Sequence, residues 1–325
     1  MIINPDRPFE IGHKVSGEAR CILYDENMKP IYDSGWDKNV ICNQGLDLLH
    51  TDSNPTAYTY VGDGTGAVLE TNSAMSNLIG YTSVTGTGND VFVQPVTPNW
   101  EFSRTKSRRF GAGVGSGTIR EVGMGGNTSG TELVCRQLLG TPITKVATQS
   151  LDVIWRWTIW PPTYIDTDDD ILGVIDIGGI AYNYKLRPRQ LAIAKSGSFP
   201  PGSGVFGQWT RTSQTDAFWG AWNGDIGDAF TSTVPSGTYA SGFGTFPATV
   251  GSYGSGQRYV LITKTGGLTA YNITSGGTGI RSLTASSTIG LWQCQFNAVS
   301  GGGRIPKTGS NEIETVWKFS WDRKV

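Results

Sequence analysis

The residues best suited to chemistry lie between positions 209 and 228, where aromatic and acidic side chains are interspersed in a glycine-rich stretch. The aromatic members are Trp209, Phe218, Trp219 and Trp222, and the acidic members are Asp216, Asp225 and Asp228. Aromatic rings stack on sugars and anchor neighbouring proteins, because each offers a large rigid face. Hydrolysis of a glycosidic bond needs two positioned carboxyl groups, and spacing alone does not make these acids converge. The stretch therefore predicts a saccharide-binding surface or a contact between subunits.

A second set of candidate ligands is the acidic segment 163–170. Its carboxylates Asp166, Asp168 and Asp170 are hard oxygen ligands of the kind that calcium prefers. The segment lacks the glycine and the terminal glutamate of an EF-hand loop, and closely spaced acids are usually solvated. We expect an acidic linker, with calcium binding as the alternative. The sequence predicts no other metal and no cofactor.

Other chemical motifs are weak. The run from Gly202 to Gly207 fits G-x-G-x-x-G, but it follows Phe199-Pro200-Pro201 instead of a strand and no helix follows it. His13 and His50 are the only histidines, which excludes a histidine-rich zinc site. A Ser-His-Asp triad would have to use one of them, and His50 is better placed to cap a helix. No catalytic residue is predicted, and we expect a protein that is not an enzyme.

The element that positions these residues is repeated. Segments 143–159 and 305–321 align without a gap, with identities at Ile143 and Ile305, Lys145 and Lys307, and Trp155 and Trp317. In both segments alternate residues are apolar, which is the pattern of a strand with one face in the core. Pro161-Pro162 ends the first of these strands, because proline cannot continue a hydrogen-bonded ladder. We predict that each segment closes one β domain, with Trp155 and Trp317 facing the core.

Alternation and turn signals predict strands through most of the chain. In the first half they cover 17–24, 30–33, 56–62, 91–96, 101–110, 118–123 and 132–138. In the second half they cover 171–175, 180–186, 258–264, 268–273 and 288–296. Two short helices are predicted, over 43–49 and 73–79, the second stopped by Gly80.

Composition agrees with an all-β chain. The 325 residues include 45 glycines and only 16% charged residues, and this length holds about two domains. We predict two β-sandwich-like domains, an N-terminal one over 1–162 with one or two short helices and a C-terminal one over 171–325 with glycine- and aromatic-rich loops. The net charge of -1 gives no excess of positive charge of the kind that binds nucleic acid. The basic cluster Arg104, Lys106, Arg108 and Arg109 is expected to form a solvated or interface face.

Targeting and redox signals are also sparse. The N-terminus lacks the apolar core of a signal peptide, and no stretch has membrane-spanning length, so no membrane insertion is expected. The cysteines Cys21, Cys42, Cys135 and Cys294 are scattered in apolar contexts. We expect buried free thiols in a protein assembled in a reducing cytoplasm, with a structural disulfide as the alternative.

Several motifs of the first half occur in a recognisable order. They are Tyr60 to Gly66 with its "GTG", Thr71 to Gly80, Arg108 to Gly113, Ile119 to Met124 with its "EVG", Leu133 to Leu139, and Pro142 to Lys145. In this order, and together with the opening 15–49, the chain resembles structural proteins of tailed bacteriophages, namely tail fibre, tail tip or other appendage subunits. The resemblance covers roughly residues 15 to 160. Beyond Pro161 only the closing strand, in segment 305–321, is similar to part of it.

The resemblance implies a place in a virion and no chemistry. We expect a structural subunit of a phage tail or external appendage that contributes to adsorption on the host surface. The N-terminal domain would dock to other virion proteins, and the C-terminal domain would face the host or a second copy in a homo-oligomer. A bacterial surface saccharide or receptor is the expected external partner. The alternatives are a head decoration or collar protein without receptor contact, and a polysaccharide-degrading tail spike.

Overall fold

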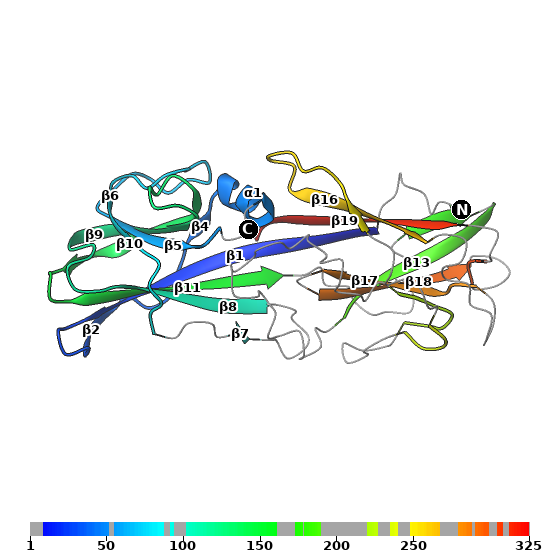
Figure 1. The fold of residues 1–325 in the computed structure, drawn as a ribbon, viewed down its shortest axis with the longest axis horizontal. Helices are drawn as coiled ribbons and strands as arrows, with labels where there is room; N and C mark the ends of the chain where they lie inside the picture. The colour runs from blue at the N-terminus through cyan, green and yellow to red at the C-terminus, as the bar shows by residue number, and fades with distance from the viewer. Residues whose placement is uncertain are drawn as a thin grey trace. The chain divides into compact units, whose positions relative to one another are not determined.

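The structure is a computed structural model. It describes residues 9–51, 55–87, 92–93, 102–160, 173–177, 179–189, 220–226, 235–239, 248–266, 279–287, 290–298, 304–307 and 312–324. Strands dominate these residues, and the only helix among them is α1 (Asn43–Thr51) (Figure 1). The predicted all-β class is confirmed, and so is the helix predicted over 43–49.

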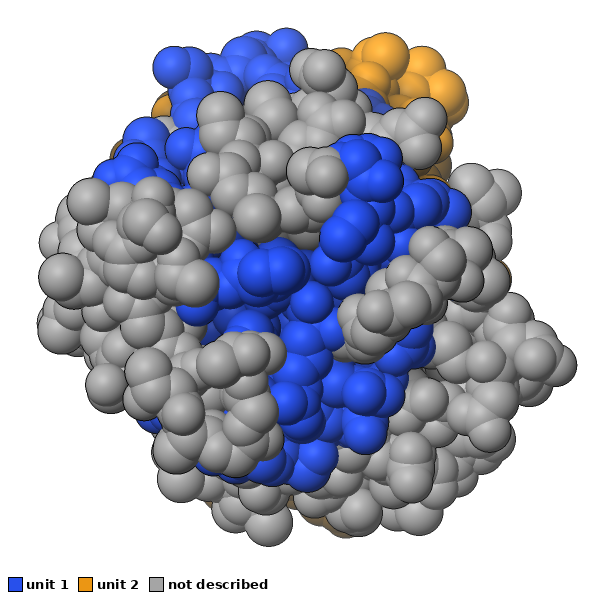
Figure 2. Space-filling view, turned by 90° about the vertical axis from the view of Figure 1, so that its right-hand side faces the viewer, with its two compact units in different colours: residues 1–12, 161–199, 209–320 blue, residues 13–160, 200–208, 321–325 orange. Residues whose placement is uncertain are grey.

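The chain divides into two compact units, which are coloured separately in Figure 2. Unit 1 contains residues 9–12 and the described residues between 173 and 320. Unit 2 contains the described residues of 13–160 and 321–324. The division between 160 and 161 falls close to the predicted end of the first domain, but the two chain ends differ from the prediction. Strands β1 (Phe9–Tyr24) and β19 (Ile313–Arg323) each supply residues to both units.

Unit 2 is built from two antiparallel sheets. In the first, the strand order is β1, β11 (Ser150–Trp160), β8 (Phe102–Phe110) and β7 (Phe92–Val93), and β2 (Pro30–Asp33) and β3 (Asp37–Lys38) pair with the other edge of β1. In the second, the order is β4 (Val40–Ile41), β10 (Leu133–Lys145), β9 (Gly117–Gly125), β5 (Tyr58–Gly62) and β6 (Leu78–Thr82). Strand β10 runs past its predicted end at Leu138, with an irregularity between Leu138 and Ile143 that accommodates Pro142.

The core of unit 2 lies between these sheets. The Trp155 indole of β11 is fully buried and donates a 3.0 Å hydrogen bond to the Thr59 hydroxyl of β5. The Lys106 ammonium of β8 donates to the Thr56 carbonyl at 2.7 Å and to its hydroxyl at 2.9 Å. The first contact joins one sheet to the other, and the second joins β8 to the turn before β5. The prediction that the basic cluster forms a solvated or interface face is wrong at Lys106, whose side chain is buried and satisfies polar groups of the same unit.

Unit 1 also contains two sets of strands. One is the sheet β12 (Gly173–Ile177), β13 (Ile180–Arg189), β18 (Gly290–Ala298), β17 (Ser282–Ser287) and β14 (Gly220–Trp222). The other is the ladder of β15 (Ala248–Val250), β16 (Tyr259–Gly266) and β19. Phe9 packs between them, with its ring centroid 4.7 Å from that of Trp317 and 5.8 Å from that of Phe296. The predicted strand 268–273 lies outside the described residues.

The identical residues of the two repeated segments are buried in both copies. All three identities are buried in both copies, namely Ile143 and Ile305, Lys145 and Lys307, and Trp155 and Trp317. The core-facing prediction for both tryptophans is confirmed. Burial lowers the pKa of the ammonium groups of Lys145 and Lys307. In the first copy the Lys145 ammonium donates to the Gly111 carbonyl at 3.0 Å, which stabilises the charge by a hydrogen bond.

The helix predicted over 73–79 is wrong. The structure has turns there, and β6 begins at Leu78. The amides of this segment bond to tertiary acceptors: Met75 N–H donates to the Gly130 carbonyl at 3.1 Å and Asn77 N–H to the Glu121 carboxylate at 2.9 Å. Because these partners replace the acceptors four residues earlier in the chain, no helical turn forms.

The four cysteines are buried and free, so the expected free thiols are confirmed. In the described part of the chain, no helix is long and apolar enough to cross a membrane.

Candidate functional site

Arg136 on β10 and Glu121 on β9 form an ion pair in unit 2 in which both partners are buried, with side chains 1% and 0% exposed. The Arg136 Nε donates to Glu121 Oε2 at 2.6 Å. Its terminal nitrogens donate to the backbone carbonyls of Gly66 and Ala67 and to the side chains of Asn72 and Ser76. Glu121 in turn accepts the amide of Asn77. Every donor of the guanidinium is used, as a buried arginine requires.

This network shows where four motifs of the first half meet. Gly66 comes from the "GTG" segment, Ser76 from the segment 71–80, Glu121 from the "EVG" strand and Arg136 from the segment 133–139. They meet at one buried ion pair that ties the long loop between β5 and β6 to the second sheet of unit 2. A carboxylate and a guanidinium that are fully paired and excluded from solvent have no free lone pair or proton for a substrate. The network is therefore architectural.

Only one of the predicted aromatic site residues is described. Trp222 ends β14, and its ring centroid lies 4.8 Å from that of Tyr239, whose side chain is exposed. The Trp222 indole nitrogen has no hydrogen-bond partner in the described part of the chain. Trp209, Phe218 and Trp219 lie outside the described residues, so their placement beside Trp222 stays a prediction.

The predicted acids are similarly divided. The Asp225 carboxylate forms a 2.5 Å ion pair with Arg281, and 56% of the Asp225 side chain is exposed. Asp216 and Asp228 lie outside the described residues, as do the calcium candidates Asp166, Asp168 and Asp170. Among the residues that are described, no three His, Cys, Asp or Glu side chains are placed to share a metal ion.

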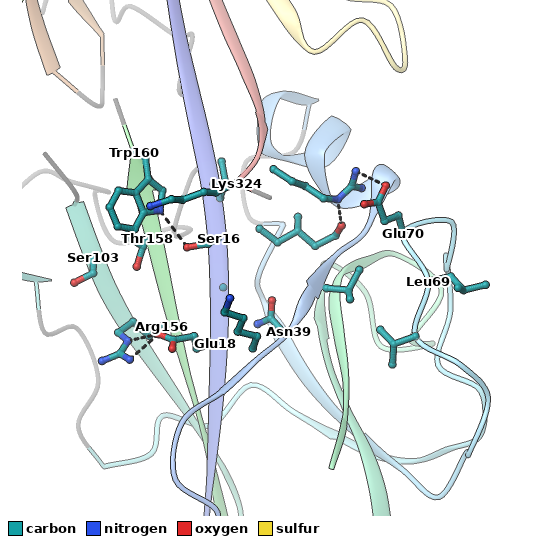
Figure 3. Close-up of a pocket in the computed structure, with 17 residues that line it drawn as sticks. Ser16, Glu18, Asn39, Leu69, Glu70, Ser103, Arg156, Thr158, Trp160 and Lys324 are labelled. Atoms are coloured by element: carbon teal, nitrogen blue, oxygen red, sulfur yellow. Dashed lines mark hydrogen bonds and ion pairs between the residues drawn. The ribbon is translucent and has the colours of Figure 1, made fainter. Parts of the chain in front are cut away.

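A cavity of about 660 Å³ lies in unit 2, in the size range of small-ligand sites (Figure 3). Its walls come from residues 15–18 of β1, the β3–β4 segment, residues 68–70, Ser103 of β8, the last residues of β11, and residues 323–324. The sequence did not indicate this site, because its residues come from six separate segments and form no linear motif.

Two ion pairs flank the cavity on opposite sides of the view in Figure 3. On one side the Arg156 Nε donates to Glu18 at 2.7 Å, and the guanidinium lies 4.3 Å from the ring centre of Trp36. On the other side Arg323 donates to Glu70 at 2.8 Å and also to the backbone carbonyl of Ile41 at 2.5 Å. Both carboxylates of the lining are thus neutralised by arginine.

The remaining charge is positive. The lining contains four cationic side chains, Lys38, Arg156, Arg323 and Lys324, against two carboxylates, Glu18 and Glu70. The Lys324 ammonium lies over the indole of Trp160, a cation–π contact. The indole nitrogen of Trp160 donates to the Ser16 hydroxyl at 3.2 Å. The two lysines therefore leave the cavity with a surplus of two positive charges.

Asn39 lies between the two ion pairs in Figure 3. Its side-chain nitrogen and oxygen are both buried and have no hydrogen-bond partner in the described part of the chain. The amide group packs against Gly17 of β1, where an added Cβ would lie within 2.4 Å of the Asn39 oxygen. Glycine at this position admits the amide. A buried amide that lacks protein partners is costly, so its donor and acceptor are available to a ligand or to solvent.

The arrangement offers groups that can bind a polar anion. Glu18 and Glu70 are each paired with an arginine, whereas the Asn39 amide and the lysine ammonium groups can donate hydrogen bonds to such a ligand. Comparison with known proteins adds no family: no family model, no curated protein and no solved structure matches the chain.

Proposed function

We propose that the protein is a structural subunit of a tailed-phage particle, located in the tail or another external appendage. The observation that carries the proposal is the use of the phage-like motifs. Residues from four of them form the buried network around Arg136 and Glu121. Motifs that serve one buried structural centre are expected in a protein whose role is architecture, whereas an enzyme needs open, reactive groups.

Within this proposal, unit 1 supplies the surface that meets a partner. The described pair of Trp222 and Tyr239 supports such a surface, since two rings in tilted contact, of which Tyr239 is exposed, suit contact with a sugar or with a second copy of the chain. Partners would be other virion proteins, further copies in a homo-oligomer, and a bacterial surface saccharide or receptor. The protein would be assembled in the host cytoplasm and reside in the virion.

The test is to locate the chain in purified particles. Antibodies against the full chain are expected to label the tail or an appendage in electron micrographs, and the purified chain is expected to compete with particles for adsorption to host cells. Labelling of the head or neck alone, with no competition, would favour the decoration or collar alternative. Absence of the chain from particles would overturn the proposal.

The tail-spike alternative has its own measurement. The full chain is incubated with purified surface polysaccharide of the host, and chain length is followed by size-exclusion chromatography. Unchanged length is expected. Shortened chains that persist in an Asp225→Asn variant but disappear in Asp216→Asn or Asp228→Asn would assign the protein to the hydrolases instead.

A further inference from the structure

We propose that the cavity of unit 2 binds an acidic saccharide, a hydroxyl-rich ligand that carries carboxylate groups. This site is separate from the aromatic stretch of unit 1, and the inference does not depend on where the protein resides. It rests on the charge surplus, the buried Asn39 amide and the paired strands of the cavity walls.

The charge surplus selects for an anion. The arginines Arg156 and Arg323 are occupied by Glu18 and Glu70, so they hold the walls in place. The exposed ammonium of Lys38 has no partner in the described part of the chain, and that of Lys324 rests on an indole. Ammonium groups act as point charges that attract an oxyanion from several directions. A ligand with one or two carboxylates would neutralise the site.

The amide selects for hydroxyl groups. Asn39 offers two N–H donors and an acceptor, and a sugar hydroxyl can meet either because it both donates and accepts. Ser16 and Thr158 add hydroxyl groups to the same lining. An anion without hydroxyl groups would accept from the lysines but would leave the Asn39 oxygen without a donor. A ligand that combines hydroxyls with carboxylates satisfies both requirements.

The strand pairing disfavours an acidic peptide. Peptides commonly bind in extended form by adding a strand to an open sheet edge. Here the stretch of β1 that lines the cavity pairs with β11 on one side, and its residue Glu18 pairs with Lys38 of β3 on the other. Strand β11 also pairs on both sides, with β1 and with β8. The β1 and β11 walls therefore present side chains, and the edge strand β4 in the lining is only two residues long, too short to template an added strand.

The experiment is calorimetric titration of the full chain at 0.15 M ionic strength, a condition under which exposed charges are partly screened. Hyaluronan tetrasaccharide, which alternates glucuronate with N-acetylglucosamine, is the acidic probe, and chitotetraose is the matched neutral probe. Tetraglutamate and inorganic phosphate test for a peptide and for a bare anion. We expect the acidic saccharide to bind about three- to thirtyfold more tightly than the neutral one, as two weakly screened charge pairs allow.

Variants place the binding in the cavity. Lys38→Gln and Lys324→Gln remove one surplus charge each, and each is expected to weaken the acidic probe about two- to fivefold. Asn39→Asp adds a carboxylate and removes two donors, so it is expected to weaken binding about tenfold or more. Lys29→Gln is the matched control, an exposed lysine in the turn between β1 and β2, and is expected to bind like the unchanged chain.

Several results would overturn the inference. These are absence of heat at millimolar hyaluronan tetrasaccharide, equal affinity for chitotetraose, equal affinity for tetraglutamate or phosphate, and unchanged binding in both lysine variants. If Asn39→Asp lowers the melting temperature, the two exposed lysine variants decide the question alone, because neither side chain supports the core.

Discussion

Asp152 on β11 and Arg109 on β8 stand opposite each other in register and join through two 2.6 Å hydrogen bonds. The Asp152 side chain is fully buried, whereas 26% of the Arg109 side chain is exposed. Both residues also form hydrogen bonds with Thr87, whose amide donates to Asp152 and whose hydroxyl accepts from Arg109. A buried carboxylate is thus neutralised by a cation at the border of the sheet, and hydrogen bonding to Asp152 raises the pKa of the Arg109 guanidinium.

The first prediction concerns this pair. Arg109→Met strands a carboxylate in the interior and is expected to destabilise the protein by about 3–5 kcal/mol. Asp152→Asn leaves a partly exposed guanidinium that water can reach, so a loss of only about 1–3 kcal/mol is expected. Urea unfolding followed by fluorescence compares the two variants. A greater loss for Asp152→Asn would contradict the assignment of the buried partner.

The second prediction concerns the buried network of unit 2. Arg136→Met leaves Glu121 charged and buried, which costs about 3–5 kcal/mol. The double variant Glu121→Gln with Arg136→Met removes that charge and is expected to cost less than the sum of its single changes. Thermal unfolding of the four proteins forms the cycle. Strict additivity would show that the two side chains do not interact.

The third prediction concerns the repeated tryptophans. Trp155→Ala and Trp317→Ala each empty a core position and are expected to cost about 3–5 kcal/mol. The first also leaves the Thr59 hydroxyl without its donor, and the second removes the ring beside Phe9. Tyr81→Ala, at an exposed position of β6, is the control and should change stability little. A Trp317→Ala protein with unchanged melting would refute its core position.

The fourth prediction is protection of the thiols. Burial raises the pKa of Cys42 to about 11 and that of Cys21 to about 12, and it raises the pKa values of Cys135 and Cys294 as well. Since only the thiolate reacts, none of the four should react with a disulfide reagent at pH 8 in the folded protein. All four should react in denaturant. Rapid labelling of any thiol without denaturant would show that its surroundings open easily.

The fifth prediction concerns the chain ends. Proteolysis is expected to cut between 161 and 170, a range that contains the predicted linker 163–170. Fragment 171–325 lacks Phe9, which packs against Trp317 and Phe296 in unit 1. A synthetic peptide of residues 1–12 is therefore expected to raise the melting temperature of that fragment, and a Phe9→Ala peptide should not. Equal effects of both peptides would mean that the ring contributes nothing to unit 1.

Local sequence patterns predicted most of the longer strands and one helix, but not β6, β14, β15 or β17. Alternation in β11 and β19 identifies the buried faces, because side chains on a strand point to opposite sides in turn. The same reasoning failed over 73–79, where Glu121 and Gly130 supply acceptors for the backbone amides. No short-range pattern contains that information, since those acceptors lie more than forty residues away in the chain, as the 44-residue separation of Asn77 and Glu121 shows.

The aromatic and acidic candidates followed from residue type alone, and only Trp222 and Asp225 have a described environment. The cavity of unit 2 depends on tertiary contacts from the start. Asn39 reaches its buried position because Gly17 of a neighbouring strand has no side chain, and Lys324 approaches Trp160 because the chain end returns to β1, where its amide donates to the Val15 carbonyl. The periodicity of a strand depends on neighbouring residues and can be recognised in the sequence. A binding site assembled from distant segments exists only when the chain has folded.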